Sequence, residues 1–277
     1  MRLPDGIPSL KDLGLLKNTD FYRQHVDFNR QFIERHQKAM AGYGRHWGLD
    51  PFKLWSRRWE YPYVAQRLLE FKPAKVLDAG SGVTYFPYFI IENLPQTQFI
   101  CCDYDPSYAP MFQRINHDRQ QDKVSFLQCP LQSLPLGDAS LDAICCISVL
   151  EHTDNYAQIV EEFARVLKPG GLLVITFDLS LDGKFTLPRR EAAELMLTVS
   201  RRFDFAGGID PQQELNRMNE DGILTSDYVR RTEPHLLPWS FPVRVYKAAT
   251  DLLSGKGWTG GFRSRTIFCM HALKKTA

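Results

Sequence analysis

Short apolar runs alternate with helix-length stretches between residues 75 and 203. The apolar runs have the length and composition of buried strands and cover residues 75–79, 98–103, 123–128, 141–149 and 171–177. Most of them are followed by a stretch long enough for a crossover helix, at residues 83–93, 106–117, 154–167 and 188–203. Because parallel strands need such crossovers, the pattern predicts an α/β protein with a doubly wound, mostly parallel sheet and helices on both faces.

The first 72 residues follow a different pattern. Residues 1–19 contain prolines and glycines with little periodicity and are predicted to be irregular. Asp20 is a suitable N-cap, and apolar residues at helical spacing then predict an amphipathic helix to about Met40. Pro62 suits the first position of a second helix that runs to about Phe71. Residues 1–72 are therefore predicted to form an N-terminal helical cap.

Beyond residue 203 the alternation weakens. Residues 204–240 contain several glycines and prolines and are predicted to be a long, mostly irregular insertion. A helix at 243–254 and a last strand at 264–273 are expected after it. We therefore divide the chain into the cap and a second unit, residues 73–277, which carries a substrate-side insertion at about 179–262. The cap and the insertion together are expected to form a lid and a substrate pocket.

Aromatic and basic residues alternate in the cap between residues 45 and 63. They are Trp47, Trp55, Trp59, Tyr61 and Tyr63, interleaved with Arg45, His46, Lys53, Arg57 and Arg58. Such a stretch can form a stacking or anion-binding surface. It can equally be a cap that packs its tryptophans on the main domain and leaves its arginines in solvent, and we favour this second interpretation for most of the residues.

Composition narrows the possible partners and the cellular compartment. A net charge of +2 gives no support for a nucleic-acid binder that works by bulk electrostatics. The six cysteines lack the spacing of zinc or redox sites, so no metal is expected and they are interpreted as small buried hydrophobes in a reducing compartment. The N-terminus has no apolar signal region, and no apolar run approaches the roughly 18 residues of a membrane span. We expect a soluble, cytoplasmic protein.

The stretch Lys75–Tyr85, KVLDAGSGVTY, combines a strand, a glycine turn and a helix start. Glycines at Gly80 and Gly82 let the backbone take unusual dihedral angles and let a ligand come close, while the helix N-terminus offers unpaired N–H groups. Dinucleotides and S-adenosylmethionine both fit this arrangement. A dinucleotide site needs a small residue where this chain has Tyr85, which favours the single-nucleoside ligand.

Four motifs in order resemble one known family. They are VLDAGSG (76–82), FICCDYD (99–105), SLPLGDASLDAICCISVLEH (133–152) and RVLKPGGLLVIT (165–176). In this region, roughly residues 75–178, the chain resembles the class I S-adenosylmethionine-dependent methyltransferases, in particular the small-molecule group that includes ubiquinone-type methyltransferases. The resemblance implies a Rossmann-like sheet of seven strands, S-adenosyl-L-methionine as the cofactor and methyl transfer as the reaction.

The resemblance also implies roles for individual cofactor-binding residues. Gly80 and Gly82 would let the amino-acid end of the cofactor lie on the backbone. Asp78 would engage the cofactor's ammonium group, directly or through water. Asp103 would accept hydrogen bonds from both ribose hydroxyls, which suits a carboxylate with two acceptor oxygens. Tyr104 would flank the adenine.

Two departures from the family pattern bear on the cofactor. Thr84 replaces a frequent third glycine, although its hydroxyl can still cap the helix. Pro130 stands where many members carry an Asp that holds the adenine amino group, so adenine recognition would fall to the backbone near Leu131 or to Gln132. Ser148, at the end of the fourth strand, would lie beside the methionine portion of the cofactor.

His152 is the candidate catalytic residue. An oxygen nucleophile needs a base, and histidine titrates near neutrality. A purely structural role, bracing the turn after the fourth strand, is an equal alternative. Glu151 is interpreted as structural or cofactor-side, Asp178 is a secondary candidate at the same rim, and His235 is interpreted as solvent-exposed.

The favoured hypothesis is O- or N-methylation of a small-molecule or sugar-containing acceptor. The pair Arg57 and Arg58, with tryptophans nearby, would suit an acceptor with an anionic group, such as a nucleotide-linked or phosphorylated one. One alternative is a non-catalytic module of the same fold that binds S-adenosylmethionine or S-adenosylhomocysteine, which Thr84 and Pro130 would permit. A third hypothesis is a nucleic-acid or protein methyltransferase. Nucleic acid is disfavoured as the substrate, because there is no basic excess and no (N/D)PP(Y/F)-type motif follows the fourth strand.

Overall fold

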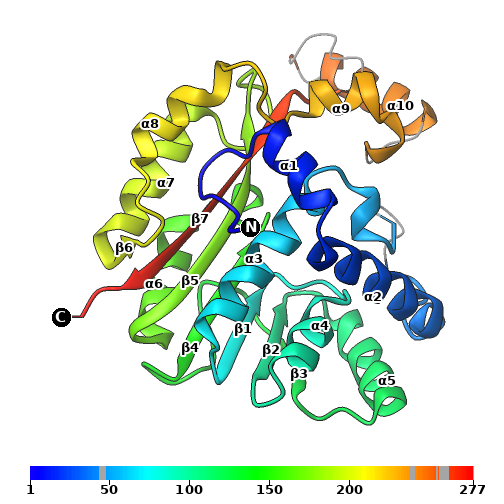
Figure 1. The fold of residues 1–277 in the computed structure, drawn as a ribbon, viewed down its shortest axis with the longest axis vertical. Coiled ribbons are helices and arrows are strands. Elements are labelled where there is room, and N and C mark those ends of the chain that lie inside the picture. The colour runs from blue at the N-terminus through cyan, green and yellow to red at the C-terminus, as the bar shows by residue number, and fades with distance from the viewer. Residues whose placement is uncertain (44–47, 238–240, 254, 256–261, 277) are drawn as a thin grey trace.

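A seven-stranded sheet forms the centre of the structure, a computed structural model that describes residues 1–43, 48–237, 241–253, 255 and 262–276 (Figure 1). The strand order is β3-β2-β1-β4-β5-β7-β6, and β7 runs antiparallel to both of its neighbours while the other pairs are parallel. The strands are β1 (Lys75–Ala79), β2 (Gln98–Asp103), β3 (Val124–Gln128), β4 (Leu141–Ile147), β5 (Leu167–Ser180), β6 (Phe203–Phe205) and β7 (Arg265–Lys274). The predicted doubly wound, mostly parallel sheet of seven strands is confirmed.

Helices cover both faces of the sheet, because alternate residues of each strand point to opposite sides. Val76 of β1 belongs to one hydrophobic cluster and its neighbour Leu77 to the other. The first cluster packs α2 (Asp20–His36), α3 (Arg57–Phe71), α4 (Phe86–Asn93) and α5 (Ala109–Arg119) on one face. The second packs α6 (Tyr156–Val166), α7 (Arg189–Arg202) and α8 (Pro211–Asn216) on the other.

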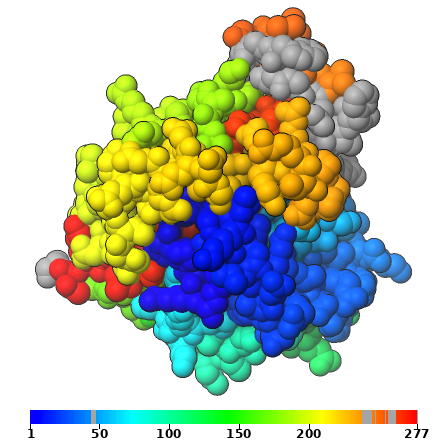
Figure 2. All heavy atoms as spheres, turned by 45° about the horizontal axis from the view of Figure 1, so that its top comes forward, coloured from blue at the N-terminus to red at the C-terminus, as the bar shows by residue number. Residues whose placement is uncertain are grey.

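The chain begins with an ordered segment, so the prediction of an irregular stretch over residues 1–19 is wrong. Helix α1 (Leu10–Lys17) begins after Ser9, whose hydroxyl accepts a hydrogen bond from the N–H of Asp12 at 3.0 Å. Gly6 exchanges two backbone hydrogen bonds with Cys269 of β7. Figure 2 shows this segment against the residues before α9, where Leu10 N–H donates to the carbonyl of Gly222 at 2.7 Å.

Two predicted helix boundaries in the cap are wrong. The first helix ends at His36 rather than near Met40, and its N-cap is Thr19. The second helix, α3, begins at Arg57, so Pro62 lies inside it and not at its first position. An interior proline costs a helix about 3 kcal/mol. Burial on both sides of it outweighs this cost, because large side chains in the same helix are fully buried, among them Trp59 and Tyr63.

The favoured interpretation of the cap is right for its described tryptophans and wrong for Arg57 and Arg58. Trp55 and Trp59 are buried, as expected of a cap that packs on the main domain. The arginines are not solvated, since the side chains of Arg57 and Arg58 are each only 20% exposed and both form ion pairs. Arg45, His46 and Trp47 lie outside the described residues. Ion pairs with Glu60 and Glu233, rather than contact with solvent, therefore hold Arg57 and Arg58 in place.

Residues 204–240 contain helices, so the prediction of a mostly irregular insertion is wrong for the part that is described. Helix α8 begins after Asp210, whose carboxylate accepts from the N–H of Gln212 at 2.9 Å. Helix α9 (Ser226–Thr232) begins after Thr225 in the same way. The expected C-terminal helix and last strand appear as α10 (Phe241–Leu253) and β7. Short 3₁₀ turns complete the elements, at η1 (Pro51–Lys53), η2 (Pro106–Tyr108), η3 (Leu150–His152), η4 (Arg217–Asn219) and η5 (Pro234–Leu236).

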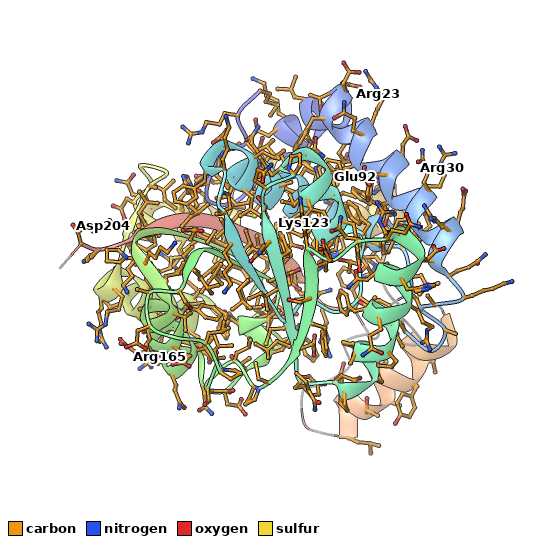
Figure 3. All side chains as sticks on the ribbon, turned by 90° about the horizontal axis from the view of Figure 1, so that it is seen from below. Arg23, Arg30, Glu92, Lys123, Arg165 and Asp204 are labelled. Carbon is orange, nitrogen blue, oxygen red and sulfur yellow. The ribbon has the colours of Figure 1, made fainter. Side chains whose placement is uncertain are left out.

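Charged side chains of both signs point outward at the rim of the molecule, among them Arg23, Arg30 and Asp204 (Figure 3). Arg23 and Arg30 pair with acids three residues away on α2. Exposed pairs of this kind contribute about 0–1 kcal/mol each. All six cysteines are free thiols and buried, as the sequence predicted. Within the described ranges no helix is long and apolar enough to cross a membrane.

Candidate active site

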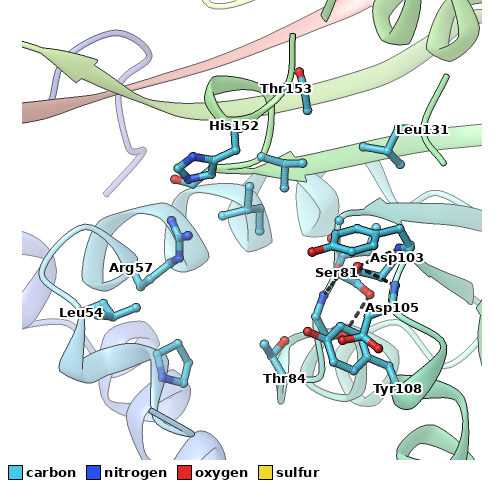
Figure 4. Close-up of a pocket in the computed structure, with 18 of the residues that line it drawn as sticks. Leu54, Arg57, Ser81, Thr84, Asp103, Asp105, Tyr108, Leu131, His152 and Thr153 are labelled. Carbon is cyan, nitrogen blue, oxygen red and sulfur yellow. Dashed lines mark hydrogen bonds between the residues drawn. The ribbon is translucent and has the colours of Figure 1, made fainter. Parts of the chain in front are cut away.

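A cavity of about 1010 Å³ opens beyond the carboxyl ends of the parallel strands (Figure 4). Its walls come from the ends of β1, β2, β4 and β5, from η3, from the start of β7 and from the cap. In doubly wound sheets the strand order reverses beside β1, which is where ligands bind. The volume reaches the upper end of the range for single-ligand pockets, about 300–1,000 Å³. The cavity therefore has room for a cofactor together with an acceptor.

The glycine turn after β1 forms one end of the cavity. Gly80 has φ +74° and Gly82 has φ +54°, a conformation that costs other residues about 1–2 kcal/mol. A Cβ atom on Gly80 would stand 2.5 Å from a methyl group of Val149, and one on Gly82 would stand 2.4 Å from the hydroxyl of Tyr43. The backbone conformation and the neighbouring side chains therefore both favour glycine at these two positions.

Asp78 lies at the end of β1 directly below this turn. It is only 3% exposed, and the thiol of Cys145 lies 3.6 Å from its Oδ1. Burial, together with the charge of Asp103, raises the pKa of Asp78 to about 7. No ion pair satisfies Asp78 within the described part of the chain. A buried carboxylate of this kind fits a cationic group that a ligand supplies.

Asp103 ends β2 and is fixed by backbone groups on two sides. Its Oδ2 accepts from the N–H of Gly82 at 3.1 Å, and its Oδ1 accepts from the N–H of Tyr104 at 2.8 Å. Burial raises the pKa of Asp103, and the N–H groups of Gly82, Asp105 and Tyr104 offset part of this rise. A carboxylate has about four acceptor positions, and the N–H groups of Gly82, Tyr104 and Asp105 use three of them. Asp103 therefore keeps one position, on Oδ2, for a ligand hydroxyl.

Next to Asp103 the cavity is lined by aromatic, apolar and amide side chains. Tyr104 is 81% exposed, whereas Leu131 is buried, and both line the cavity with Gln132. Tyr43 of the cap meets Tyr108 edge-to-face here, with 5.4 Å between the ring centroids. This side of the cavity therefore offers aromatic, apolar and amide groups to a ligand.

Arg57, His152, Asp178 and Arg265 form the opposite end of the cavity. Figure 4 shows Arg57 and His152 together, apart from Ser81, Asp103 and Tyr108. His152 is exposed on the cavity wall. Desolvation by the surrounding wall lowers its pKa, Asp178 opposes this effect, and Arg57 and Arg265 add to it. His152 is therefore neutral at pH 7 and can accept a proton. Asp178 forms an ion pair with Arg265 at 2.5 Å.

Glu60 of α3 fixes this end from behind. It is completely buried, and its Oε1 accepts from the hydroxyls of Ser148 and Thr176, each at 2.6 Å. Its Oε2 pairs with Arg57. Burial alone would raise the pKa of Glu60, but Arg57 and the two hydroxyl groups lower it overall. Ser148 itself has φ +49°, so this contact holds a strained strand end.

A second acid, the half-buried Glu151, lies beside this network. Burial and the charge of Asp178 raise its pKa to about 8, so Glu151 is mostly protonated at neutral pH. Its Oε1 accepts from the backbone N–H of Asp178 at 3.1 Å. This hydrogen bond connects η3 to the end of β5, which agrees with a structural role for Glu151.

The residues predicted for the site all line this one cavity. They are Asp78, Gly80, Gly82, Asp103, Tyr104, Leu131, Gln132, Ser148 and His152. The secondary candidate Asp178 lines it as well. His235 is exposed on η5 away from the cavity.

The sequence did not indicate every residue that shapes the cavity. Glu60 carried no signal, because a glutamate in a helix is ordinary until its burial is known. Arg57 lines the cavity, whereas Arg58 turns away and pairs with Glu233. Tyr85 packs toward α2, with its hydroxyl 2.8 Å from Nδ1 of His25, and takes no space above the glycine turn. It therefore gives no reason to prefer one ligand class.

Comparison with known proteins identifies the central region. Residues 77–175 match a family described as a methyltransferase domain. A probable S-adenosylmethionine-dependent methyltransferase of Mycobacterium tuberculosis is 36% identical over 130 residues, which cover 46% of this chain and 44% of the relative. A demethylmenaquinone methyltransferase of Deinococcus radiodurans is 31% identical over 119 residues, which cover 43% and 48%. The chain thus spans about half the length of the curated relatives it matches.

Solved structures extend the likeness to the whole fold. A putative sarcosine dimethylglycine methyltransferase from Galdieria sulphuraria has a TM-score of 0.53 at 17% identity, over 90% of this chain and 98% of that one. The [4+2]-cyclase SpnF has a TM-score of 0.55 at 16% identity, over 98% and 100%. These likenesses show the fold, which alone does not define a reaction.

The central region of the chain is therefore similar to methyltransferase domains, and the curated relatives that match it include probable S-adenosylmethionine-dependent methyltransferases. The residues at the glycine end fit this cofactor, because a buried acid, a turn without room for side chains and a backbone-held carboxylate lie in one cavity. Among the described residues no group of three or more His, Cys, Asp or Glu side chains could hold a metal ion.

Proposed function

We propose that this protein transfers a methyl group from S-adenosylmethionine to an oxygen or nitrogen atom of a small-molecule or sugar-containing acceptor. The observation that carries the proposal is one cavity with two chemically different ends. An acidic end surrounds the glycine turn, and an end with arginines and a neutral histidine faces it. The volume of about 1010 Å³ suits two ligands that meet.

The acidic end would hold the cofactor. Asp78 would pair with its ammonium group, and Gly80 and Gly82 would let its amino-acid part lie on the backbone. Asp103 would accept a hydrogen bond from a ribose hydroxyl. The bound cofactor supplies a methyl group that is already activated for displacement.

Residues beyond Asp103 at the acidic end would hold the adenine. Tyr104, Leu131 and Gln132 would contact the adenine, with Gln132 as the polar group. Pro130 is exposed and offers no side-chain acceptor. Ser148, held by Glu60, would lie beside the methionine part.

The remaining task of the protein is alignment and proton removal. A well-oriented pair of reactants gains several kcal/mol over free encounter. His152 would orient the acceptor and, for a hydroxyl acceptor, take its proton, because the neutral imidazole has a free lone pair. An amine acceptor that is already neutral would need only the orienting role.

The cap and the insertion would close the acceptor side. Residues 1–72 contribute Tyr43, Arg57 and Tyr61 to the cavity wall. Residues 179–262 meet the cap where the N–H groups of Leu10 and Trp55 donate to the carbonyls of Gly222 and Leu236. We propose that these parts act as the lid that selects the acceptor. Free buried thiols suit a reducing compartment, which supports a cytoplasmic location, and the net charge of +2 supports an acceptor other than nucleic acid.

Calorimetric titration with S-adenosylhomocysteine tests the cofactor site. Wild type should bind it, Asp103→Ala should bind at least tenfold more weakly, and Asp122→Ala, an exposed acid outside the cavity, should bind like wild type. If wild type binds neither this ligand nor S-adenosylmethionine, the methyltransferase proposal fails. If Asp103→Ala binds as well as wild type, the ribose assignment is wrong.

Turnover separates an enzyme from the non-catalytic alternative. A methyl-labelled S-adenosylmethionine incubated with a metabolite extract should yield a labelled product with wild type. Tight cofactor binding without any labelled product would favour a binding module. The likeness to a structure named as a cyclase makes this measurement necessary.

A further inference from the structure

The two ends of the cavity carry opposite kinds of charge. Three acids, Asp78, Asp103 and Asp105, surround the glycine turn. The opposite end carries a group that we call the arginine end, made of Arg57, Arg263 and Arg265. A cofactor with an ammonium group and ribose hydroxyls needs the first end. The cofactor also carries one carboxylate, which an arginine can bind, so the test below distinguishes that group from an anionic acceptor.

Arg57 is held so that it presents a fixed face to the cavity. Its Nη1 pairs with Glu60, and the other oxygen of Glu60 is fixed by two hydroxyl groups in the strand ends. Burial alone would lower the pKa of Arg57, but Glu60 raises it overall, so the charge is permanent. A guanidinium has five N–H donors in a planar fork, and one of them serves Glu60. The remaining fork matches a carboxylate or phosphate group.

Among the described residues, Glu60 is the one acid within bonding distance of Arg57, so the rest of its planar fork is left for a ligand. Asp178 is already paired with Arg265. Glu151 is mostly protonated at neutral pH, because burial raises its pKa to about 8. Asp154 also lines the cavity but is exposed, so solvent screens its charge. Burial and the charge of Arg265 lower the pKa of Arg263, and the acids Asp251 and Asp178 oppose this effect.

Apolar groups surround Arg57 on the cap side. Leu54, Trp55 and Tyr61 line the cavity there, and Trp55 is only 2% exposed. A low-dielectric wall strengthens an ion pair formed against it. It also favours an acceptor whose body is apolar, because such a body gains about 25 cal/mol for each Å² that it buries.

We propose that the arginine end is an anion-binding acceptor subsite, in which Arg57 binds a carboxylate or phosphate group on an acceptor with an apolar body. This proposal rests on the proposed methyl transfer. Glu60 is the positioning residue of the subsite. Arg58, one residue on, contributes nothing to it, because it bonds to Glu233 and to the carbonyl of Phe52 outside the cavity.

The test uses simple probes on protein saturated with S-adenosylhomocysteine, so that only the acceptor end is open. Phenyl phosphate and benzoate supply the two anions on an apolar ring, and benzamide is the neutral control. Isothermal calorimetry is run on wild type, Arg57→Gln, Arg57→Lys and the matched control Arg58→Gln. Arg57→Lys keeps a charge for Glu60 but loses the planar fork, so it serves if Arg57→Gln does not fold.

We expect at least one anion to bind wild type and Arg58→Gln alike, at least tenfold more tightly than benzamide. Both Arg57 variants should lose at least tenfold in that affinity, and the better probe assigns carboxylate or phosphate. Equal binding of benzamide, no anion binding to wild type, or an effect of Arg58→Gln equal to that of Arg57→Gln would overturn the proposal. A loss of S-adenosylhomocysteine affinity in Arg57→Gln would also overturn it, since Arg57 would then hold the cofactor's own carboxylate.

These outcomes are separate from the proposed function. Failure of S-adenosylhomocysteine to bind wild type refutes methyl transfer, and the probes are then titrated into the ligand-free protein to test the subsite alone. If that ligand binds and the anions do not, methyl transfer stands and the anionic acceptor is excluded.

Discussion

The glycine end and the arginine end of the cavity recognise ligands in different ways. At the glycine end the backbone shapes the ligand site. The N–H groups of Gly82 and Tyr104 hold Asp103 in place, and two glycines with positive φ leave room for a ligand. At the arginine end side chains shape the ligand site, and a buried acid, Glu60, holds Arg57 in place. A site built on backbone tolerates few substitutions. A site built from side chains can change its ligand while the fold persists.

The largest effect is expected at the arginine end, from His152→Ala. Removing a general base typically lowers kcat by about 10²–10⁴-fold, and S-adenosylhomocysteine affinity should stay unchanged. Steady-state kinetics with the identified acceptor measures the effect, and His235→Ala, an exposed histidine outside the cavity, is the control. Unimpaired turnover in His152→Ala would leave His152 with only the structural role.

The next effect concerns the support of the arginine end. Glu60→Gln leaves Arg57 without its buried counter-charge and should lower the free energy of unfolding by about 3 kcal/mol. Urea denaturation measures it, with Glu70→Gln as the control on the same helix, because Glu70 is 42% exposed and should cost less than about 1 kcal/mol. Equal losses in the two variants would show that Glu60 is not a special support.

A smaller effect is expected at the glycine end, from Gly80→Ala. The left-handed conformation should cost about 1–2 kcal/mol, and the contact with Val149 at 2.5 Å should also weaken cofactor binding. Thermal unfolding and S-adenosylhomocysteine titration measure the two parts. Gly137→Ala is the control, because a Cβ at Gly137 meets nothing within 4 Å. A Gly80→Ala variant that binds normally would contradict the close approach of the ligand.

The smallest effect is the pH dependence of cofactor binding. The pKa of Asp78 is about 7 in the ligand-free protein, and a cationic ligand favours its ionised form. Below that pKa a proton has to leave Asp78 on binding, so affinity should fall by up to tenfold per pH unit as pH falls and stay level above it. Titrations from about pH 5.5 to 8 measure this, and Asp78→Asn should flatten the profile. A flat wild-type profile would mean that Asp78 does not meet the ammonium group.

The two ends also differ in how far the sequence predicted them. The glycine end is built at successive strand ends by short motifs, so the sequence alone was enough to assign Asp78 and Asp103 to it. At the other end of the cavity, Arg57 and Arg265 of the arginine end and the nearby His152 lie on three separate elements. Only tertiary packing brings them together, and no local pattern distinguishes Arg57 from Arg58.

The same limit applies to the fold. Strand periodicity predicted the central sheet, because buried strands leave continuous apolar runs. The start of α3 was missed, since the burial of Trp59 and Tyr63 outweighs the helix-breaking tendency of Pro62. Helices α8 and α9 were missed because they are only six and seven residues long, too short for a periodic signal.

Comparing S-adenosylhomocysteine affinity in wild type, Asp103→Ala and Arg57→Gln tests most directly whether the two ends are separate sites. If they are, calorimetry should show a loss of at least tenfold for Asp103→Ala and an unchanged affinity for Arg57→Gln. Equal losses in the two variants, or no loss in Asp103→Ala, would contradict the division of the cavity into a cofactor end and an acceptor end.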